Sequence, residues 1–434
     1  MLYSNLKTND KGHLEFAGVD TIELCKQYGT PLVVFDEQGI RDNCQIYLDA
    51  VKQNFGEGSF VAYASKAFSC IRIKQIMKQE GMCLDVSSIG EIFTAQQAGF
   101  DMSKVYYHGN FKTEDDIRFA IKSGVGFFMV DNFEELVRLG RIADEMKIRQ
   151  AVYLRVTPGV NVSTHKAVQT GSNDSKFGVA ISTGQAMEFI KDALAIKSIQ
   201  VQGFHIHIGS QIFEIEPYLR ASSILMQFVS DVKAKTTFEA QSLVLGGGFG
   251  VRYIEGQSKI DYAEYITQIA KHIRFEVARL GLEMPNIGFE PGRSIIAQNG
   301  LTLYKVGSVK EIQGAKNYVV VDGGMNDNPR YALYNSPYTI YVANRMDTKT
   351  DFVASIAGRA CESGDLVQEN VLIPKPTEGD VIAVTVTGAY TYSMASNYNR
   401  MTRPCVVLVD KKGARRVIIR KESLEDLIAL DNKI

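Results

Sequence analysis

One lysine lies at the end of an apolar run and is the first candidate for covalent chemistry. Residues 60–67 are FVAYASKA, a run with the aromatic and β-branched character of a strand, and Lys66 stands near its end. An ammonium group on the inward face of a buried strand is unfavourable unless it is paired, deprotonated or modified. Lys66 either extends to solvent or is a Schiff-base lysine, made nucleophilic by a pKa that burial lowers. The local sequence leaves both interpretations open.

A glycine-rich segment, LGGGFG at 245–250, indicates anion binding. Backbone N–H groups can approach a phosphate closely here because Gly247 and Gly248 carry no Cβ. The segment is not a dinucleotide fingerprint, since Val251 stands where G-x-G-x-x-G requires its third glycine. It predicts a phosphate cradle, joined by Gly292, unless it is only a tight turn.

Two histidines two residues apart, His205 and His207 in HIHIGSQ, point to the same side of a strand. Such a pair also fits a metal hydrolase, but no further His or carboxylate cluster has metal-ligand spacing. We therefore expect no metal. We expect His205 to be a core residue and His207, nearer the strand end, to present a flat surface to a planar ligand.

A carboxylate ends another apolar run, at Glu290 in GFEPGRS. A buried glutamate usually has a cationic partner, which here is either Arg293 or a cofactor nitrogen. A lysine for an imine, a phosphate cradle, a flat histidine and a carboxylate for a pyridinium nitrogen together predict pyridoxal 5'-phosphate.

These residues lie at the ends of eight strand-like runs that alternate with segments of helical pattern. The alternation predicts an α/β fold with a parallel sheet, and eight successive units favour a closed (β/α)8 TIM barrel over an open sheet. A barrel places its site at the carboxyl ends of its strands. We expect it to occupy residues 31–296, with strands at 60–66, 83–87, 105–110, 127–132, 152–156, 201–209, 243–248 and 287–291.

Two other parts of the chain differ from this pattern. Residues 157–178 are rich in Gly, Ser, Thr and Asn and too long for an ordinary connection, so we expect a lid over the active face rather than a disordered insert. Beyond residue 297 the runs are short, Val- and Ile-rich and separated by turn residues. They predict a second, all-β domain of sandwich or barrel-like form, made of residues 297–434 and completed by residues 1–30, with one closing helix at 422–430.

The composition restricts the partners. The 434 residues carry a net charge of −1, which leaves no basic footprint for nucleic acid or an anionic membrane. An apolar leader and an apolar run of about 18 residues are both missing, so we expect a soluble, cytoplasmic protein. The six cysteines include no C-x-x-C pair, which argues against a disulfide framework or zinc cluster. Small molecules or proteins are the expected partners.

With these residues in place, the chain resembles the barrel-type, fold type III pyridoxal-phosphate decarboxylases over nearly its whole length. The resemblance rests on an ordered series of motifs. They are YASKA around Lys66, HGN at His108, SKFG at 175–178, HIHIGSQ, GGGFG, EPGRS, VDGGMND at 321–327, CESGD at 361–365, and GAY followed by SNYN within 388–399.

The resemblance implies a role for each matching residue. Lys66 is similar to the lysine that forms the internal aldimine, His207 to the histidine stacked on the ring, and Glu290 to the partner of the ring nitrogen. Cys361 is similar to the acid that protonates the substrate carbanion. The implied contacts to cofactor and phosphate are Ser210, Gly247, Gly248, Gly292, Arg293 and Tyr390, and those to substrate are Arg293, Arg330, Tyr334, Glu362 and Tyr390.

The implied reaction is that of a carboxy-lyase. In such enzymes Cys361 and Glu362 reach the site from a second subunit, which implies an obligate homodimer with shared active sites. Arg293 and Arg330 suit a substrate with more than one carboxylate. The likeness is greatest to the members that convert meso-2,6-diaminopimelate to L-lysine and CO2, the last step of lysine biosynthesis.

Other interpretations stay open at this stage. Phe68, Ile89 and Tyr331 replace the Asn, Gly and Pro that are usual in the family, and they would alter the substrate rather than the reaction. The main alternative is a related decarboxylase for another dicarboxylic or carrier-bound amino acid. A racemase would be expected to have a cation where Glu290 stands. A non-catalytic regulatory homologue is opposed by the intact Lys66 and Cys361.

Overall fold

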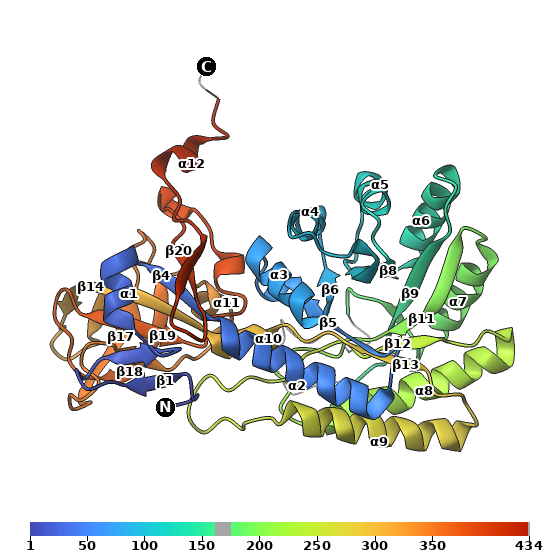
Figure 1. The fold of residues 1–434 in the computed structure, drawn as a ribbon, viewed down its shortest axis with the longest axis horizontal. Coiled ribbons are helices and arrows are strands. Elements are labelled where there is room, and N and C mark those ends of the chain that lie inside the picture. The colour runs from blue at the N-terminus through green and yellow to red at the C-terminus, as the bar shows by residue number, and fades with distance from the viewer. Residues whose placement is uncertain (161–174, 433–434) are drawn as a thin grey trace. The chain divides into compact units, whose positions relative to one another are not determined.

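The computed structural model describes residues 1–160 and 175–432, which form two compact units (Figure 1). The first, which we call the barrel unit, comprises Asn43–Gly250 and Ile260–Ser294. The second, the β unit, comprises Met1–Asp42, Val251–Lys259 and Ile295–Ile434.

The barrel unit contains a closed ring of eight parallel strands. Each strand pairs with the next along the chain, and the last pairs with the first, which confirms the predicted TIM barrel. The ring consists of β5 (Phe60–Ala64), β6 (Cys83–Val86), β7 (Val105–Tyr107), β8 (Phe127–Val130), β9 (Gln150–Thr157), β11 (Ile199–His205), β12 (Ser242–Val244) and β13 (Asn286–Phe289). The short β10 (Val179–Ala180) pairs with β9 outside the ring.

Helices alternate with these strands, and Figure 1 shows α3 to α9 around the outside of the ring. Side chains cap several of these helices: Asn132 accepts from the Glu135 N–H at 2.9 Å, and Thr113 forms a capping box with Asp116. The helices are α2 (Glu37–Phe55), α3 (Ile71–Glu80), α4 (Ile89–Gln97), α5 (Glu114–Lys122), α6 (Phe133–Glu145), α7 (Gln185–Ala195), α8 (Glu216–Thr236), α9 (Tyr262–Leu280) and α10 (Arg293–Ile296).

Aromatic side chains pack within the ring. The Tyr106 ring stacks on Phe60 and on Phe127, with centroids 4.6 Å apart in both pairs, and the buried Met129 and Tyr153 belong to the same cluster. The barrel is therefore a packed core and not a pore, and ligand chemistry belongs at its strand ends.

The β unit is built on two sheets. The larger has the order β18-β17-β15-β14-β4-β20-β21, with β19 paired to β14 and β16 paired to β19; the smaller joins β1, β2 and β3. The strands are β1 (Leu6–Thr8), β2 (Leu14–Phe16), β3 (Val19–Asp20), β4 (Leu32–Asp36), β14 (Gly300–Lys310), β15 (Tyr318–Val321), β16 (Ile340–Val342), β17 (Phe352–Ala357), β18 (Leu366–Ile373), β19 (Val381–Thr385), β20 (Cys405–Val409) and β21 (Arg415–Ile419). This confirms a separate sheet domain, and α12 (Leu424–Ile428) confirms the closing helix expected at 422–430. The structure adds α1 (Thr21–Tyr28) and α11 (Arg330–Tyr334).

The boundary between the units differs from the one expected at residue 31. Strand β4 lies inside the expected barrel range 31–296, but it pairs antiparallel with β14 and parallel with β20. All four residues of its apolar run LVVF are buried, and Leu32 and Val34 belong to the same core cluster as Leu301 and Val407. The partners of β4 are far along the chain, so a local pattern does not identify them.

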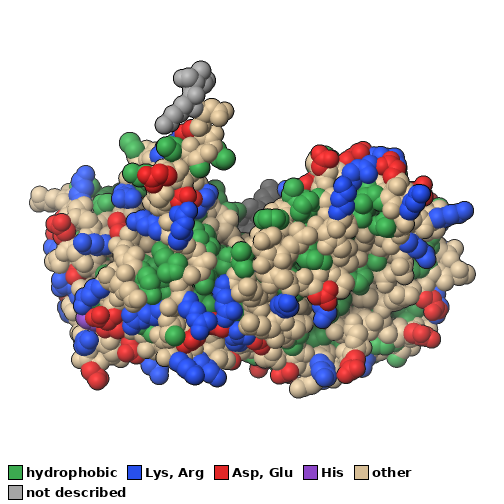
Figure 2. Space-filling view, turned by 45° about the horizontal axis from the view of Figure 1, so that its top comes forward, with side chains coloured by type: hydrophobic (Ala, Val, Ile, Leu, Met, Phe, Trp, Pro, Cys, Tyr) green, Lys and Arg blue, Asp and Glu red, His purple; other side chains and the backbone are tan. Residues whose placement is uncertain are grey.

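The surface carries both signs of charge. Figure 2 shows Lys and Arg side chains interspersed with Asp and Glu, as expected for a net charge of −1. Of the helices within residues 1–160 and 175–432, none has the length and apolar content that a membrane span requires.

Candidate active site

Lys66 lies on a 3₁₀ turn, Ser65–Ala67, that follows β5 directly. Its Nζ donates a 2.8 Å hydrogen bond to Oδ2 of Asp85 on β6. The Asp85 side chain is 1% exposed, whereas that of Lys66 is 45% exposed. The lysine is therefore not an inward-facing residue of a buried strand, as one interpretation of the sequence required. It is an accessible amine held at the strand end by a buried carboxylate.

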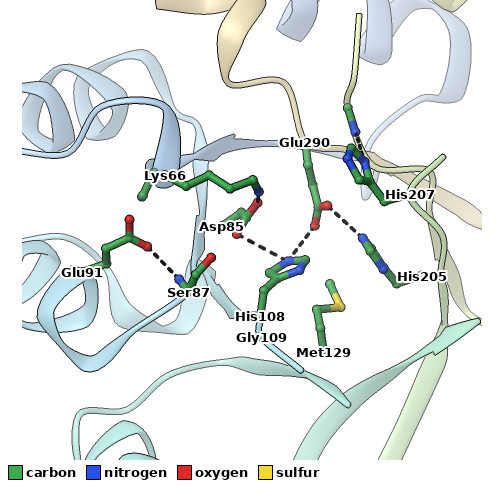
Figure 3. Close-up of polar contacts among 12 residues, drawn as sticks. Lys66, Asp85, Ser87, Glu91, His108, Gly109, Met129, His205, His207 and Glu290 are labelled. Atoms are coloured by element: carbon green, nitrogen blue, oxygen red, sulfur yellow. Dashed lines mark hydrogen bonds and ion pairs between the residues drawn. The ribbon is translucent and has the colours of Figure 1, made fainter. Parts of the chain in front are cut away.

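Polar contacts continue from Asp85 to Glu290 (Figure 3). His108 Nε2 lies 3.7 Å from Asp85 Oδ1 and 2.9 Å from Glu290 Oε1. His205 Nε2 is hydrogen-bonded at 3.0 Å to the other Glu290 oxygen. The two imidazole rings meet edge to face, with centroids 5.1 Å apart. Each oxygen of the buried Glu290 thus faces an imidazole.

The protonation states in this cluster follow from burial and charge. Burial alone would raise the pKa of Glu290, but His108 and His205 hold it well below its usual value. Burial lowers the pKa of His205 to about 4. It also lowers that of His207 to well below its usual value, with Arg155 and Lys66 adding to the effect. Near pH 7 Glu290 is therefore ionised, and its negative charge can stabilise a cationic ring nitrogen.

The expectation that one strand carries both histidines of the H-x-H pair is wrong, because β11 ends at His205 and His207 lies beyond it. The two side chains have different partners. His205 contacts Glu290, whereas Nδ1 of His207 accepts from the Gly247 N–H at 3.4 Å. The set that does come together is His108, His205 and Glu290, whose ligand atoms lie within 4.8 Å of one another and are chemically able to hold a metal ion. The contacts of 2.9 and 3.0 Å already join these three side chains to one another.

In the segment predicted to bind phosphate, the backbone of Gly247 and Gly248 packs closely against that of Glu290 and Gly209. A Cβ on Gly247 would lie 2.2 Å from the Glu290 carbonyl oxygen, and one on Gly248 would lie 2.2 Å from that of Gly209. Gly248 also has a φ of +95°, which favours glycine. The Gly248 carbonyl accepts from the Ile212 N–H at 3.0 Å, which fixes the segment against the end of β11.

The remaining cradle residues lie on the turns that follow β11 and β13. The Arg293 guanidinium donates to Ser210 Oγ at 3.1 and 3.3 Å, so the structure brings these two predicted contacts together. A Cβ on Gly292 would lie 2.8 Å from that of Ala64, which places the EPGRS turn against the end of β5. Three glycines at which a Cβ would clash with the neighbouring chain, an accessible amine and an ionised carboxylate suit the phosphate, the aldehyde carbon and the ring nitrogen of pyridoxal phosphate.

In the β unit, three predicted substrate residues lie together. The buried Arg330 begins α11, and its guanidinium stacks over the rings of Tyr334 and Tyr390, with 5.1 and 5.7 Å to their centroids. Its Nη2 donates to Ser336 Oγ at 3.3 Å. Stacking on two rings orients the planar donor fork of this arginine.

Cys361 and Glu362 lie on the loop between β17 and β18, and both are exposed. Cys44, Cys70 and Cys405, by contrast, are buried. An ordinary core role for Cys361 is thereby excluded in this chain, and its thiol is accessible to a reaction partner.

The residues that depart from the family pattern have defined places. The Phe68 side chain is buried, and its carbonyl accepts from the Tyr63 hydroxyl at 2.8 Å. Ile89 is the exposed first residue of α4. Tyr331 follows Arg330 in the chain, but its hydroxyl donates to Glu369 on β18 at 2.8 Å.

Most of the predicted lid at 157–178 lies outside the described residues. Its described end, SKFG, lies against β9: the Thr157 hydroxyl donates to the Phe177 carbonyl at 2.9 Å, and the Arg155 guanidinium lies 4.5 Å from the centroid of the Phe177 ring.

A buried lysine next to this site was not identified from the sequence. The fully buried Lys74 on α3 donates to Ser65 Oγ at 2.9 Å, directly beside Lys66, and burial lowers its pKa to about 8. The helical period could have indicated its burial, because position 74 falls on the same face of α3 as the buried Ile73 and Met77.

Comparison with known proteins agrees with this site. Residues 41–297 match the family model described as "Pyridoxal-dependent decarboxylase, pyridoxal binding domain". The diaminopimelate decarboxylase of Halalkalibacterium halodurans is 44% identical over 98% of this chain and 96% of its own length. That of Bacillus subtilis is 42% identical, over 99% and 98%. The solved structure of M. jannaschii diaminopimelate decarboxylase in co-complex with L-lysine superimposes with a TM-score of 0.91 at 35% identity, and covers 99% of this chain and 98% of that one. The chain therefore belongs to the pyridoxal-dependent decarboxylase family and, within it, to the diaminopimelate decarboxylases.

Proposed function

We propose that this protein is a cytoplasmic enzyme that uses pyridoxal phosphate to convert meso-2,6-diaminopimelate to L-lysine and CO2. The observation that carries the proposal is the convergence of the accessible Lys66 amine, the ionised Glu290 and the glycine cradle at one end of the barrel. The names of its relatives support the choice of substrate.

Each residue of the barrel site has a task that its geometry suits. When bound, pyridoxal phosphate supplies an electrophilic carbon and an electron sink for the pair left by departing CO2. Lys66 attaches the cofactor through Nζ, and Glu290 keeps a proton on the ring nitrogen, which deepens that sink. His207 would pack against the ring, and Gly247, Gly248 and Gly292 would hold the phosphate, together with Ser210 and Arg293.

The β unit supplies groups for the substrate. Arg330, oriented by Tyr334 and Tyr390, binds the carboxylate that is retained in the product. Glu362 accepts hydrogen bonds from the substrate's distal ammonium group. Cys361 gives its thiol proton to Cα once CO2 has left, a general-acid step for which a thiol is suitable.

We further propose a homodimer in which Cys361 and Glu362 complete the site of the partner subunit. The exposure of their loop supports this arrangement. Mixing refolded Lys66→Ala and Cys361→Ala chains tests it. Half of the resulting dimers contain one undamaged shared site, so about one quarter of wild-type activity returns. If each chain carried its own complete site, the mixture would stay inactive.

The reaction itself is tested by product analysis. Cofactor-loaded protein is mixed with meso-2,6-diaminopimelate, and with ornithine and L-lysine in parallel. Lysine formed from the first substrate alone supports the proposal. A yellow protein that forms none retains the cofactor assignment and points to the alternative, another dicarboxylic or carrier-bound amino acid.

A further inference from the structure

The exposed loop that carries Cys361 and Glu362 needs a device to hold it. Residues 361–364 are all exposed, yet a proton donor acts efficiently only when its position is defined to within a fraction of an ångström. The SNYN motif at 396–399 has no task in the reaction described above. Residues 361–364 and 396–399 both belong to the β unit, and contacts between them show how the loop is held.

The base of the loop is fixed by Asp365. Its buried carboxylate accepts from the Met325 N–H at 2.6 Å and from the Ala360 N–H at 2.7 Å. Its carbonyl accepts from the Gly358 N–H at 2.9 Å. These bonds secure both ends of the loop but none of them reaches Cys361.

The tip of the loop is held by the last residue of SNYN. The Cys361 N–H donates to Oδ1 of Asn399 at 2.7 Å. Asn399 adopts the left-handed conformation, with φ +53° and ψ +22°. Among residues that carry a Cβ, asparagine enters this region most readily. Next to it, the Tyr398 hydroxyl lies 3.5 Å from Oε2 of Glu362, so adjacent residues of the turn face the cysteine and the glutamate.

The turn that carries Asn399 is itself anchored. Asn326 Nδ2 donates to the Tyr398 carbonyl at 2.7 Å, and the Asn326 carbonyl accepts from the Ser396 N–H at 3.0 Å. On the other side, the Arg400 guanidinium donates to the Leu427 carbonyl at 2.6 Å. VDGGMND, CESGD and SNYN, three separate motifs in the sequence, therefore form one hydrogen-bonded assembly around Cys361.

We propose that Asn399 is a positioning residue: its Oδ1, presented by the left-handed turn, fixes the Cys361 backbone so that the thiol and Glu362 enter the substrate site in one orientation. The proposal rests on the function proposed above. Asn399 itself touches neither substrate nor cofactor in this role; it acts through the loop.

The test compares two substitutions at this position with a matched control. Asn399→Gly removes the side chain and tolerates the positive φ, and Asn399→Asp retains the acceptor oxygen. Asn370→Gly is the control, since Asn370 is an exposed asparagine on β18 with the same left-handed backbone, φ +54°. We expect Asn399→Gly to lower kcat about tenfold, with a smaller change in KM, because displacement of a catalytic group slows the chemical step. Asn399→Asp keeps most of the activity, and Asn370→Gly matches the wild type.

A second measurement reports on the loop without turnover. Iodoacetamide alkylation of Cys361 is followed by peptide mass spectrometry in the full-length, cofactor-loaded protein. Asn399→Gly changes the rate at Cys361 severalfold, while Cys44 and Cys70 react as in the wild type. Asn399→Asp places a negative charge beside the thiol, so the pH midpoint of its alkylation rises by up to about one unit. This shift keeps the proposal testable if Asn399→Gly does not fold.

The positioning role is overturned if Asn399→Gly has the kcat and the alkylation rate of the wild type. It is also overturned if the pH midpoint of alkylation does not shift in Asn399→Asp. Cys361→Ala separates this proposal from the proposed function. Full activity in Cys361→Ala refutes the cysteine as the proton donor, whereas the alkylation data still decide whether Asn399 holds the loop.

Discussion

Lys66 and Asp85 form an ion pair of 2.8 Å across the ends of β5 and β6, in which the lysine is accessible and the aspartate is buried. Asp85 Oδ1 has no hydrogen-bond partner among the described residues. Lys66 is therefore the nearest cation to this carboxylate. Because Asp85 is buried, it holds the lysine amine at a fixed position. A covalent attachment at Nζ needs just this combination of an accessible amine and a rigid support.

Replacement of Lys66 by alanine removes that attachment point. Lys66→Ala loses the visible absorption band of bound pyridoxal phosphate, and turnover falls by at least about a thousandfold. The absorption spectrum and steady-state rates check both effects. Lys191→Ala, at an exposed lysine on α7, is the control and leaves both unchanged. A band that persists in Lys66→Ala would remove this lysine from its role.

Alanine at Gly248 tests the cradle. The new Cβ would lie 2.2 Å from the Gly209 carbonyl oxygen, so the segment must shift, and cofactor affinity falls at least about tenfold. Gly281→Ala is matched in backbone strain: Gly281 also has a positive φ, and no atom of the described chain lies within 4 Å of the added Cβ. Fluorescence titration of the cofactor-free proteins measures affinity. Equal affinity in the two variants would show that the close approach is unimportant.

The buried Lys74 makes stability depend on pH. Its pKa is about 8 in the folded chain and near 10.5 when unfolded, so between these values the unfolded chain binds more protons. The free energy of unfolding therefore rises with pH from about 8 to 10.5, and the full penalty of the buried charge applies below pH 8. Lys74→Met removes that penalty and stabilises the protein at pH 7 by about 1–3 kcal/mol, a gain that shrinks toward pH 10.

Urea unfolding at pH 7, 8.5 and 10 measures this gain. Lys78→Met, at an exposed position of the same helix, controls for the added apolar side chain. A gain in Lys74→Met that is constant across the three pH values would mean that Lys74 does not titrate as its burial implies.

Substrate recognition is tested by Arg330→Lys. The substitution keeps a positive charge but loses the planar donor fork that contacts the rings of Tyr334 and Tyr390. We expect KM for meso-2,6-diaminopimelate to rise about 10–100-fold while cofactor affinity is retained. Arg416→Lys, at an exposed arginine of β21, serves as the control. An unchanged KM would refute the carboxylate contact.

The ring strands could be predicted because each is an apolar run that ends at turn residues, and the barrel rule then placed Lys66, His207 and Glu290 near one face. Their contacts could not be predicted. His205 lies beside His108 and Glu290 because the ring of strands closes. The spacing in the sequence relates His205 only to His207. In the β unit, the five-residue α11 is too short to leave a helical period.

Closure of the ring also sets the order of events during synthesis. Lys66 follows the first strand of the barrel and Glu290 follows the last, and β13 joins β5 directly. A nascent chain that has emerged only as far as β12 has the amine but neither the carboxylate nor the EPGRS turn. We therefore expect stable cofactor binding only after β13 has closed the ring, and we expect chains truncated before residue 290 to retain no cofactor.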